Sequence, residues 1–281
     1  MCGRYASSRQ PEDLVEEFEV DRVDVPAPLE ADYNVAPTKE VYAVFDRLPR
    51  AEGDAPPSEP ERRLGVVRWG LVPSWAKDTS IGSRMINARV ETLASKPAFR
   101  RAFAKRRCLL PADGYFEWYP TERLGSGGRP LKQPFFIRPR DGGVLAMAGL
   151  YEIWRNEAVD RDHPDAFVWT ACVITTTAED SLGRIHDRMP MLVERAGYDA
   201  WLDAGGTEPS RLDEVLVPAA SGRLEAHPVS TQVNNVRNNG PELLESLPLA
   251  DPPSAQEAAL VQNAATAEGV SDVSADQTAL F

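Results

Sequence analysis

The stretch CLLPADGYFEWYP, residues 108–120, decides the fold class of this 281-residue chain. Two apolar runs flank Asp113-Gly114, a dipeptide typical of turns, so the stretch predicts a strand, a turn and a second strand. Further strand-like segments lie at 40–48, 64–72, 135–139, 144–154 and 167–178. Helical spacing is confined to short segments such as 11–20 and 198–204. Many strands, few helices and no regular alternation of the two predict a single α+β domain, with a mostly antiparallel β core flanked by helices.

Two segments predict irregular structure, and the C-terminus predicts disorder. Residues 49–63 are rich in proline and acidic side chains and predict a surface insertion, whereas 121–133 contain several glycines and predict a flexible connection. From residue 249 the composition changes to alanine, proline, serine, glutamine and acidic residues, which predicts a disordered acidic tail. The predicted organisation is one domain over residues 1–248 and a tail over 249–281.

Charge is unevenly distributed along the chain, whose formal net charge is −12. Residues 62–107 contain twelve arginines and lysines against two acidic residues, a net charge of +10 inside an acidic protein. Such a basic segment is typical of a binding site for a polyanion. The simpler alternative is that its arginine-rich part is a solvated helix face. The chain has 26 arginines and only 5 lysines, and an acidic, lysine-poor chain suits a halophile. Ionic contacts between a protein and DNA weaken steeply as the salt concentration rises. If the polyanion is DNA, we therefore expect stacking, shape complementarity or a covalent bond to hold it in a halophile.

Membrane, secreted and metal-cluster classes are not supported. No run of eighteen apolar residues predicts a membrane span, and the N-terminus lacks the apolar core of a signal peptide. Cys2, Cys108 and Cys172 are too few and too scattered for a disulfide framework or a thiolate metal cluster. We therefore expect a cytoplasmic monomer that needs no metal and no cofactor.

Cys2 follows the initiator methionine directly, so removal of Met1 makes it the first residue. An N-terminal cysteine carries a thiol and an α-amine on adjacent carbons. Because the pKa of an α-amine is about 8, part of it is neutral at pH 7 and attacks an aldehyde to give a Schiff base, which the thiol then closes into a thiazolidine. The amine could instead act as the base for its own thiol, as in N-terminal-nucleophile hydrolases. The plain alternative is a cysteine that stands at this position by accident.

Glu117 and His186 are candidate acid–base residues. Glu117 lies in the aromatic segment GYFEWY, where a carboxylate is either desolvated, with the raised pKa that suits proton transfer, or faces solvent from an alternating strand. His186 is flanked by Arg184, Asp187 and Arg188. Such a histidine can protonate or hydrogen-bond an oxygen of an anionic substrate, or it is simply a structural loop residue.

Asn87 and Arg89 are two residues apart, which in an extended backbone places both side chains on one face. An asparagine amide there can orient an amine, and an arginine can grip a phosphate through two hydrogen bonds. Trp69 and Trp75 bracket a proline-containing loop beside the basic segment. If exposed they form a stacking surface for unpaired bases, and if buried they are core residues.

Taken in order, these segments resemble one known family. They are MCGRY (1–5), YNVAPT (33–38), RWGLVPSWAKD (68–78), INARVET (86–92), RRCLLPADGYFEWY (106–119), AGLYEIW (148–154) and IHDRMPML (185–192). The series resembles the SRAP family (SOS-response-associated peptidase), the abasic-site processing proteins. The resemblance runs from residue 2 to about residue 248, with insertions near 50–62, 121–131 and 155–166.

The resemblance implies a DNA-damage sensor, bound to the nucleoid when on DNA, that traps abasic sites in single-stranded DNA through a thiazolidine at Cys2. It also implies peptidase-like removal of Met1 and lyase or cross-link-reversal chemistry. Asn87 would position the Cys2 amine, Glu117 would move protons, and His186 would assist opening of the deoxyribose. The implied DNA-binding residues are Gly3, Arg4, Arg89 and Arg188, and we add Trp69 and Trp75 from the sequence pattern.

Two other classes stay open. Glutamine amidotransferases of the N-terminal-nucleophile type also begin with Cys-Gly in their mature form, but the first hundred residues here lack their Arg/Asn-Gly-Asp substrate signature. A non-enzymatic reader of modified DNA bases would bind duplex DNA without any need for Cys2. Turnover of glutamine that depends on Cys2 would favour the first class, and tight binding to modified duplex would favour the second.

Overall fold

The computed structural model describes residues 2–49, 59–125, 127–178, 180–203, 212, 214–216 and 222–247. The tail predicted over 249–281 and most of the insertion predicted over 49–63 lie outside these residues. Among the helices described, none is long and apolar enough to cross a membrane.

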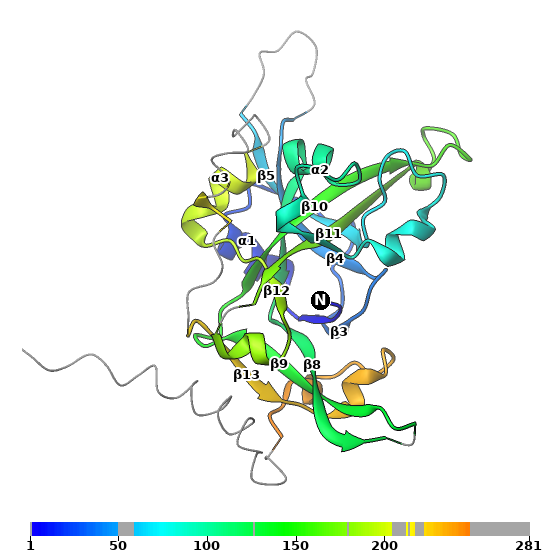
Figure 1. The fold of residues 1–281 in the computed structure, drawn as a ribbon. Coiled ribbons are helices and arrows are strands. Elements are labelled where there is room, and N and C mark those ends of the chain that lie inside the picture. The colour runs from blue at the N-terminus through cyan, green and yellow to red at the C-terminus, as the bar shows by residue number, and fades with distance from the viewer. Residues whose placement is uncertain are drawn as a thin grey trace, which may run out of the picture.

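Strands dominate the structure and form two sheets (Figure 1). The larger sheet has the order β12 (Arg188–Pro190), β11 (Phe167–Thr177), β10 (Leu145–Arg155), β7 (Arg107–Ala112), β4 (Glu40–Arg47), β5 (Glu61–Trp69) and β2 (Arg22–Asp24), and β6 (Asn87–Arg89) pairs with β11. The smaller sheet has the order β13 (Leu224–Pro228), β9 (Pro130–Pro139), β8 (Gly114–Leu124), β1 (Tyr5–Ser7) and β3 (Asp32–Val35). Most pairings are antiparallel, which confirms the predicted fold class.

Part of the larger sheet closes on itself. β5 and β11 pair in parallel at Arg68 with Thr170 and at Trp69 with Ala171, so that β5, β4, β7, β10 and β11 form a closed ring of strands. Along β4 the side chains alternate between the interior of this barrel and its outer surface. Phe45 belongs to the interior cluster with Val67, and Tyr42 to the outer cluster.

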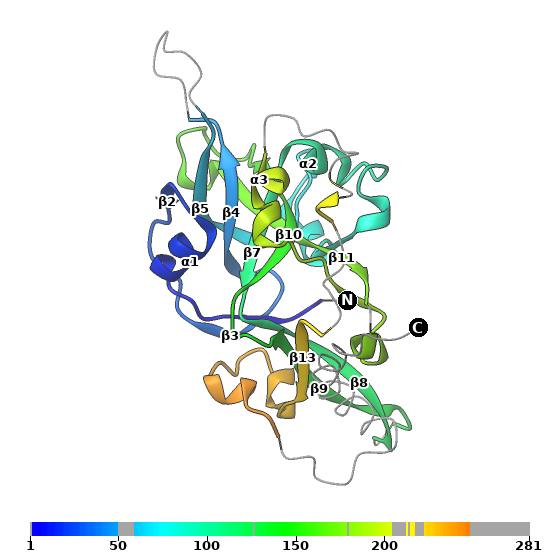
Figure 2. The ribbon, with the colours of Figure 1, turned by 90° about the vertical axis from the view of Figure 1, so that its left-hand side faces the viewer.

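Three short helices cover the outer surface of the barrel: α1 (Pro11–Phe18), α2 (Arg100–Lys105) and α3 (Tyr198–Leu202). In Figure 2 α1 and α3 lie against the barrel strands. α1 begins with a proline and two acids in its first turn, a favourable start for a helix, and buries Leu14 and Phe18. Short 3₁₀ turns connect the remaining elements: Thr79–Arg84, Val90–Thr92, Pro164–Ala166, Asp180–Arg184, Arg195–Gly197, Thr231–Asn234 and Pro241–Leu244.

The stretch 108–120 forms the predicted strand, turn and strand, but the two strands do not pair with each other. β7 pairs with β10 in the barrel, whereas β8 pairs with β1 and β9 in the smaller sheet. The Asp113 carboxylate accepts a hydrogen bond from the Ser8 amide at 2.7 Å and fixes this corner. A side chain at Gly114 would lie 2.5 Å from the Ile137 carbonyl oxygen, so only glycine fits. The corner carries the chain out of the barrel and places Glu117 beside the N-terminal strand.

The prediction of a flexible connection over 121–133 was wrong for most of that segment. β8 continues to Leu124 and β9 begins at Pro130, so the two strands extend as a long hairpin with an irregularity between Pro120 and Leu124. Likewise 61–63, predicted as insertion, start β5 because they pair with β4. Strand pairing has overridden the local composition in both places.

The basic segment 62–107 is not one continuous charged surface. Arg62 and Arg63 form ion pairs with aspartates, Arg106 pairs with Glu152 at 2.9 Å, and Arg107 donates to backbone carbonyls. Four of its twelve positive charges are therefore used within the fold. The prediction of a polyanion site depends on the other eight.

Candidate functional site

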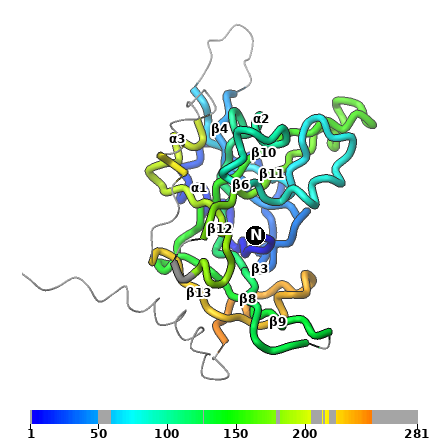
Figure 3. The backbone as a smooth tube through the Cα atoms, in the orientation of Figure 1, coloured from blue at the N-terminus to red at the C-terminus, as the bar shows by residue number. Residues whose placement is uncertain are grey.

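Cys2, Asn87, Glu117 and His186 come from distant parts of the sequence, and the structure brings them together. The N-terminus lies between the barrel and the smaller sheet, close to β12, β8 and β6 (Figures 1 and 3). The Asn87 amide donates a hydrogen bond to the Cys2 carbonyl oxygen at 2.8 Å. The carboxylate of Glu117 acts electrostatically on the Cys2 thiol, and Glu117 and His186 both respond to the charges of Asp187 and of the N-terminus.

Cys2 is fully buried at the edge of the interior cluster. Burial raises the pKa of its thiol well above the ordinary value, and the negative charge of Glu117 adds to the shift. The positive N-terminus and a hydrogen bond from the Arg4 backbone amide act in the opposite direction and are too weak to prevent it. The thiol is therefore protonated at neutral pH.

Asn87 and Arg89 lie on β6, which pairs in parallel with β11. Ala88 between them is buried, and Arg89 is exposed, which confirms the extended backbone with both polar side chains on one face. Asn87 is held in place by the pairing of its strand with β11 at Val173. The Asn87 amide thereby reaches the backbone of Cys2, whose amine is the nucleophile in the predicted chemistry.

Glu117 has 4% of its surface exposed, which excludes the solvent-facing alternative. Burial raises its pKa to about 7, although the positive N-terminus and Lys132 both lower it. Asp187 adds a further raising effect. A carboxyl group with a pKa near neutrality can both give and take a proton under physiological conditions.

His186 precedes β12, and its ring orientation is fixed. Its Nδ1 accepts a hydrogen bond from the Arg188 backbone amide at 2.9 Å and lies 3.0 Å from the Asp187 carboxylate. Burial, aided by the positive N-terminus, lowers its pKa, so the ring is neutral at pH 7.

Arg188 is occupied by groups of the protein itself. Its guanidinium holds both oxygens of Glu91, at 2.6 and 3.1 Å, and donates to the Thr175 carbonyl oxygen at 2.6 Å. A phosphate would have to compete with Glu91 for this side chain. Arg89 is exposed and is the more accessible cation of the two.

Trp69 and Trp75, which the sequence pattern treats alike, have different surroundings. Trp69 is fully buried, packs edge to face on Tyr5 with 5.0 Å between ring centroids, and donates to the Ile86 carbonyl oxygen at 3.0 Å. The prediction that it binds DNA was wrong, because its ring is enclosed by the core. Trp75 is 60% exposed and has the surface that stacking requires.

Gly3 and Arg4 follow Cys2 and are half-buried. Arg4 donates to the side-chain oxygen of Asn34 at 2.6 Å, and its guanidinium carbon lies 5.9 Å from the centre of the Trp118 ring. Sequence reasoning missed Asn34 and Trp118. The signals were present, since one lies in the motif YNVAPT and the other is the neighbour of Glu117 in GYFEWY.

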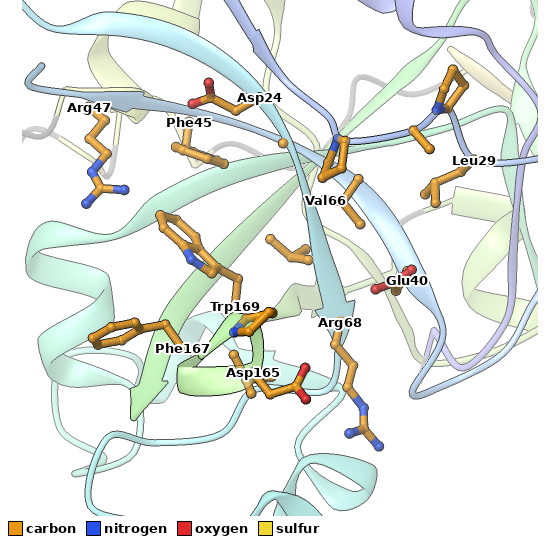
Figure 4. A pocket seen from close by; sticks show the side chains of 17 residues that line it. Asp24, Leu29, Glu40, Phe45, Arg47, Val66, Arg68, Asp165, Phe167 and Trp169 are labelled. Atoms are coloured by element: carbon orange, nitrogen blue, oxygen red, sulfur yellow. The ribbon is translucent and has the colours of Figure 1, made fainter. Parts of the chain in front are cut away.

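A separate hollow of about 800 Å³ lies between β4, β5, the start of β11 and the loop after β2 (Figure 4). Its floor is aromatic, because Trp169 stacks on Phe45 with 5.4 Å between ring centroids, and Arg47 lies over the indole. It contains none of the predicted site residues. Within the described part of the chain, no group of three histidine, cysteine or acidic side chains is arranged to hold a metal ion.

Comparisons with known proteins identify the family of the chain. The family model described as SOS response associated peptidase (SRAP) matches residues 1–236. The abasic site processing protein YoaM of Bacillus subtilis is 37% identical over 246 residues, which cover 88% of this chain and 98% of YoaM. YedK of Escherichia coli, another abasic site processing protein, is 33% identical over 87% of this chain and 99% of its own length.

Two solved structures share the fold. A crystal structure of a protein from Bacteroides thetaiotaomicron has a TM-score of 0.67 at 22% identity, covering 88% of this chain and 100% of that one. One from Bordetella bronchiseptica has a TM-score of 0.61 at 26% identity, covering 82% and 100%. With the family model matching most of its length, the chain belongs to the SRAP (SOS response associated peptidase) family.

Proposed function

We propose that this protein captures abasic sites in single-stranded DNA through the amine and thiol of Cys2, once Met1 has been removed. The observation that carries the proposal is the placement of Glu117, a buried carboxyl group with a pKa of about 7, beside Cys2 and close to the N-terminus. The names of relatives such as YoaM and YedK, abasic site processing proteins, agree with it.

The proposed chemistry begins at the amine. The ring-opened sugar of an abasic site presents an aldehyde at C1′, and the neutral Cys2 amine adds to it to give a carbinolamine. Protonated Glu117 gives its proton to the departing hydroxyl, which leaves as water, and the nitrogen and C1′ become an iminium. The iminium N–H proton then returns to the Glu117 carboxylate, which leaves a neutral imine. The thiol then adds across that imine: sulfur bonds to C1′, the thiol proton ends on nitrogen, and the thiazolidine ring is complete.

The remaining residues of the site support these steps. Asn87 holds the Cys2 carbonyl oxygen and so fixes the residue that carries the amine. Neutral His186, which lies near the N-terminus, would hydrogen-bond the ring oxygen of the closed sugar and assist opening of the ring. Reversal of the cross-link would use the same proton transfers in the opposite direction. Lyase chemistry would instead start from the Schiff base, with removal of a C2′ proton by a base of the site and departure of the 3′ phosphate.

DNA would lie across exposed cations and aromatic rings around the site. Arg89, Arg4 and Trp75 have accessible surface, and half-buried Trp118, which follows Glu117, would take the role that Trp69 cannot. An abasic nucleotide has no base, so little stacking is lost when its sugar enters a buried site. The covalent bond would also keep DNA attached where high salt weakens ionic contacts.

The amidotransferase alternative needs the thiol, rather than the amine, as its nucleophile. The Cys2 thiol has a strongly raised pKa because it is buried and next to Glu117. Such a thiol is a poor nucleophile by itself, since the thiolate is the reactive form. Aldehyde capture avoids the difficulty because its first bond forms at nitrogen.

Mixing the processed protein with a single-stranded oligonucleotide that carries one abasic site tests the proposal. We expect a heat- and denaturant-resistant adduct, and mass spectrometry should show loss of Met1 and a mass gain equal to the DNA minus one water. Cys2→Ala should give no heat-stable adduct, yet borohydride should still trap its Schiff base because the amine remains. A variant that retains Met1 should give no heat-stable adduct, because the residue that carries its α-amine has no thiol to close the ring. A stable adduct from Cys2→Ala would disprove the thiazolidine.

A further inference from the structure

A C-terminal segment lies against the candidate site and is held there by one buried side chain. The segment, which we call the strap, comprises residues 231–239, after β13 (orange in Figure 1). It lies beside β3 and near β8 of the smaller sheet. Its sequence, TQVNNVRNN, is polar, and the family model ends within it, at residue 236.

Asn34 on β3 joins the strap to the N-terminal strand. It is fully buried, and its amide nitrogen donates to the carbonyl oxygens of Val233, Asn235 and Asn238, at 3.2, 3.1 and 2.9 Å. Its side-chain oxygen accepts a hydrogen bond from Nη1 of Arg4 at 2.6 Å. The amide nitrogen and the amide oxygen of Asn34 are thus both hydrogen-bonded, which fixes the orientation of the side chain.

Arg4 is anchored at one end of its guanidinium only. Nη1 donates to Asn34 and to the Val233 carbonyl oxygen, the latter at 2.9 Å. Nε is buried and has no acceptor among the described residues. The Nε–Nη2 edge is the fork that binds both oxygens of a phosphate. Anchoring Nη1 therefore leaves the phosphate-binding edge of the guanidinium without a hydrogen-bond acceptor among the residues that the structure describes.

The strap also contacts the residue beside Glu117. The side-chain oxygen of Asn234 accepts a hydrogen bond from the Trp118 indole nitrogen at 2.7 Å. Trp118 in turn lies under the guanidinium of Arg4. The strap thus holds Arg4, two residues after Cys2, and Trp118, one residue after Glu117, in a single arrangement.

We propose that Asn34 is a positioning residue for DNA capture: it anchors Nη1 of Arg4 between β3 and the strap, so that the Nε–Nη2 edge faces a DNA phosphate next to the lesion. The inference rests on the proposed function and deepens it. Asn34 touches neither the DNA nor the reacting atoms. It acts through Arg4, and its effect belongs to DNA binding rather than to the bond-forming steps.

The test measures adduct formation against oligonucleotide concentration, which separates the half-saturating concentration from the maximal rate. Asn34→Leu, which can neither donate nor accept, should raise the half-saturating concentration about tenfold, the equivalent of about 1.4 kcal/mol, and leave the maximal rate within about twofold. Asn34→Asp keeps the acceptor for Arg4 and loses the donors to the strap. It should restore most of the DNA affinity although its melting temperature falls.

Asn239→Ala is the matched control. Asn239 ties the strap to the same strand through the Tyr33 amide, at 2.8 Å, and the Ala31 carbonyl oxygen, at 3.1 Å, but does not touch Arg4. It should loosen the strap and leave the half-saturating concentration nearly unchanged. If Asn239→Ala matches Asn34→Leu at equal melting temperature, Asn34 acts only on stability and the inference is wrong.

A double variant tests the route through Arg4. Arg4→Gln should raise the half-saturating concentration, and adding Asn34→Leu should then change nothing further, because two residues that act as one unit are not additive. A second full tenfold loss would overturn the inference. If Asn34→Leu does not fold, Arg4→Lys tests the inference instead. This variant keeps the positive charge but loses the paired donors of the Nε–Nη2 edge, so a half-saturating concentration equal to that of the wild type would refute the role of that edge.

The outcomes separate this inference from the proposed function. If wild-type protein forms no adduct at all, the covalent function fails, and the same variants are then compared by equilibrium binding of an undamaged single-stranded oligonucleotide. The predicted order stays the same in that assay, with Asn34→Leu weaker than Asn239→Ala. If the adduct forms and the two variants behave alike, only the positioning role fails.

Discussion

Glu117 and Glu152 are equally buried, each with 4% of its surface exposed, and the protein treats their charges in opposite ways. Glu152, on β10, pairs with Arg106 at 2.9 Å and accepts a hydrogen bond from the Ile153 amide at 3.0 Å. Glu117, on β8, lies next to a buried thiol and near Asp187, and burial raises its pKa to about 7. One carboxylate has an arginine partner, and the other has a raised pKa and is reluctant to ionise.

The difference separates a structural region from a functional one. A buried charge costs free energy unless a partner of opposite sign compensates it. Arg106 is that partner for Glu152. At Glu117 the positive N-terminus offsets only part of this cost, because burial still raises the pKa. Sites that perform proton transfer are where such costs persist, because a pKa near neutrality is useful there.

Replacing each glutamate by glutamine should give the largest contrast. Glu117→Gln removes the group proposed to move protons and should slow adduct formation about 10²- to 10⁴-fold, the usual contribution of general acid–base catalysis. Glu152→Gln is the control, with equal burial and no part in the chemistry. It should lower stability and leave the rate within about twofold when measured below its melting temperature. An unchanged rate for Glu117→Gln would remove Glu117 from the mechanism.

The sequence predicts local features of this molecule better than long-range ones. The strand pattern and the extended Asn87–Arg89 pair follow from alternation, which depends only on neighbouring residues. The corner at Asp113 does not, because the same dipeptide joins a hairpin or two separate sheets according to which distant strands are available. Trp69 and Trp75 show the same limit, since the local sequence does not say which of the two rings is buried in the fold and which is exposed.

The candidate site shows the limit most clearly. Cys2 and Glu117 are identifiable because their chemistry depends on residue type and on unusual placement in the sequence. Asn34 is not, since its function lies in hydrogen bonds to carbonyl groups about 200 residues away. Nor does the sequence show which cations are free: Arg62 is paired with Asp199, 137 residues later in the chain.

Removing Arg106 should destabilise the fold more than removing the cation near Glu117. Arg106→Leu leaves Glu152 buried without its partner and should lower the free energy of unfolding by about 3–5 kcal/mol. Lys132→Leu removes an exposed ammonium and should change it by about 0.5 kcal/mol or less. Denaturant unfolding measures both. Arg106→Leu combined with Glu152→Leu should recover most of the loss, because no buried charge remains, and failure to recover would mean that Arg106 stabilises the fold by packing alone.

The smallest expected effect is on the pH dependence of stability. The pKa of Glu117 is about 7 in the folded protein and about 4.5, its ordinary value, in the unfolded chain. At low pH both states hold the proton. Between these two pKa values only the folded state holds it, so stability falls as the pH rises, by about 3 kcal/mol in total, and levels off above pH 7.

Glu117→Gln cannot ionise and should not show this fall. Denaturant unfolding of the two proteins from about pH 4 to about pH 8 should therefore give curves that diverge as the pH rises, with the variant the more stable at the upper end. Parallel curves would mean that the buried carboxyl group is compensated as well as Glu152 is, and the contrast between the two regions would be lost. A variant that gains stability while losing DNA capture would show directly that the protein keeps an unfavourable charge at Glu117 for its chemistry.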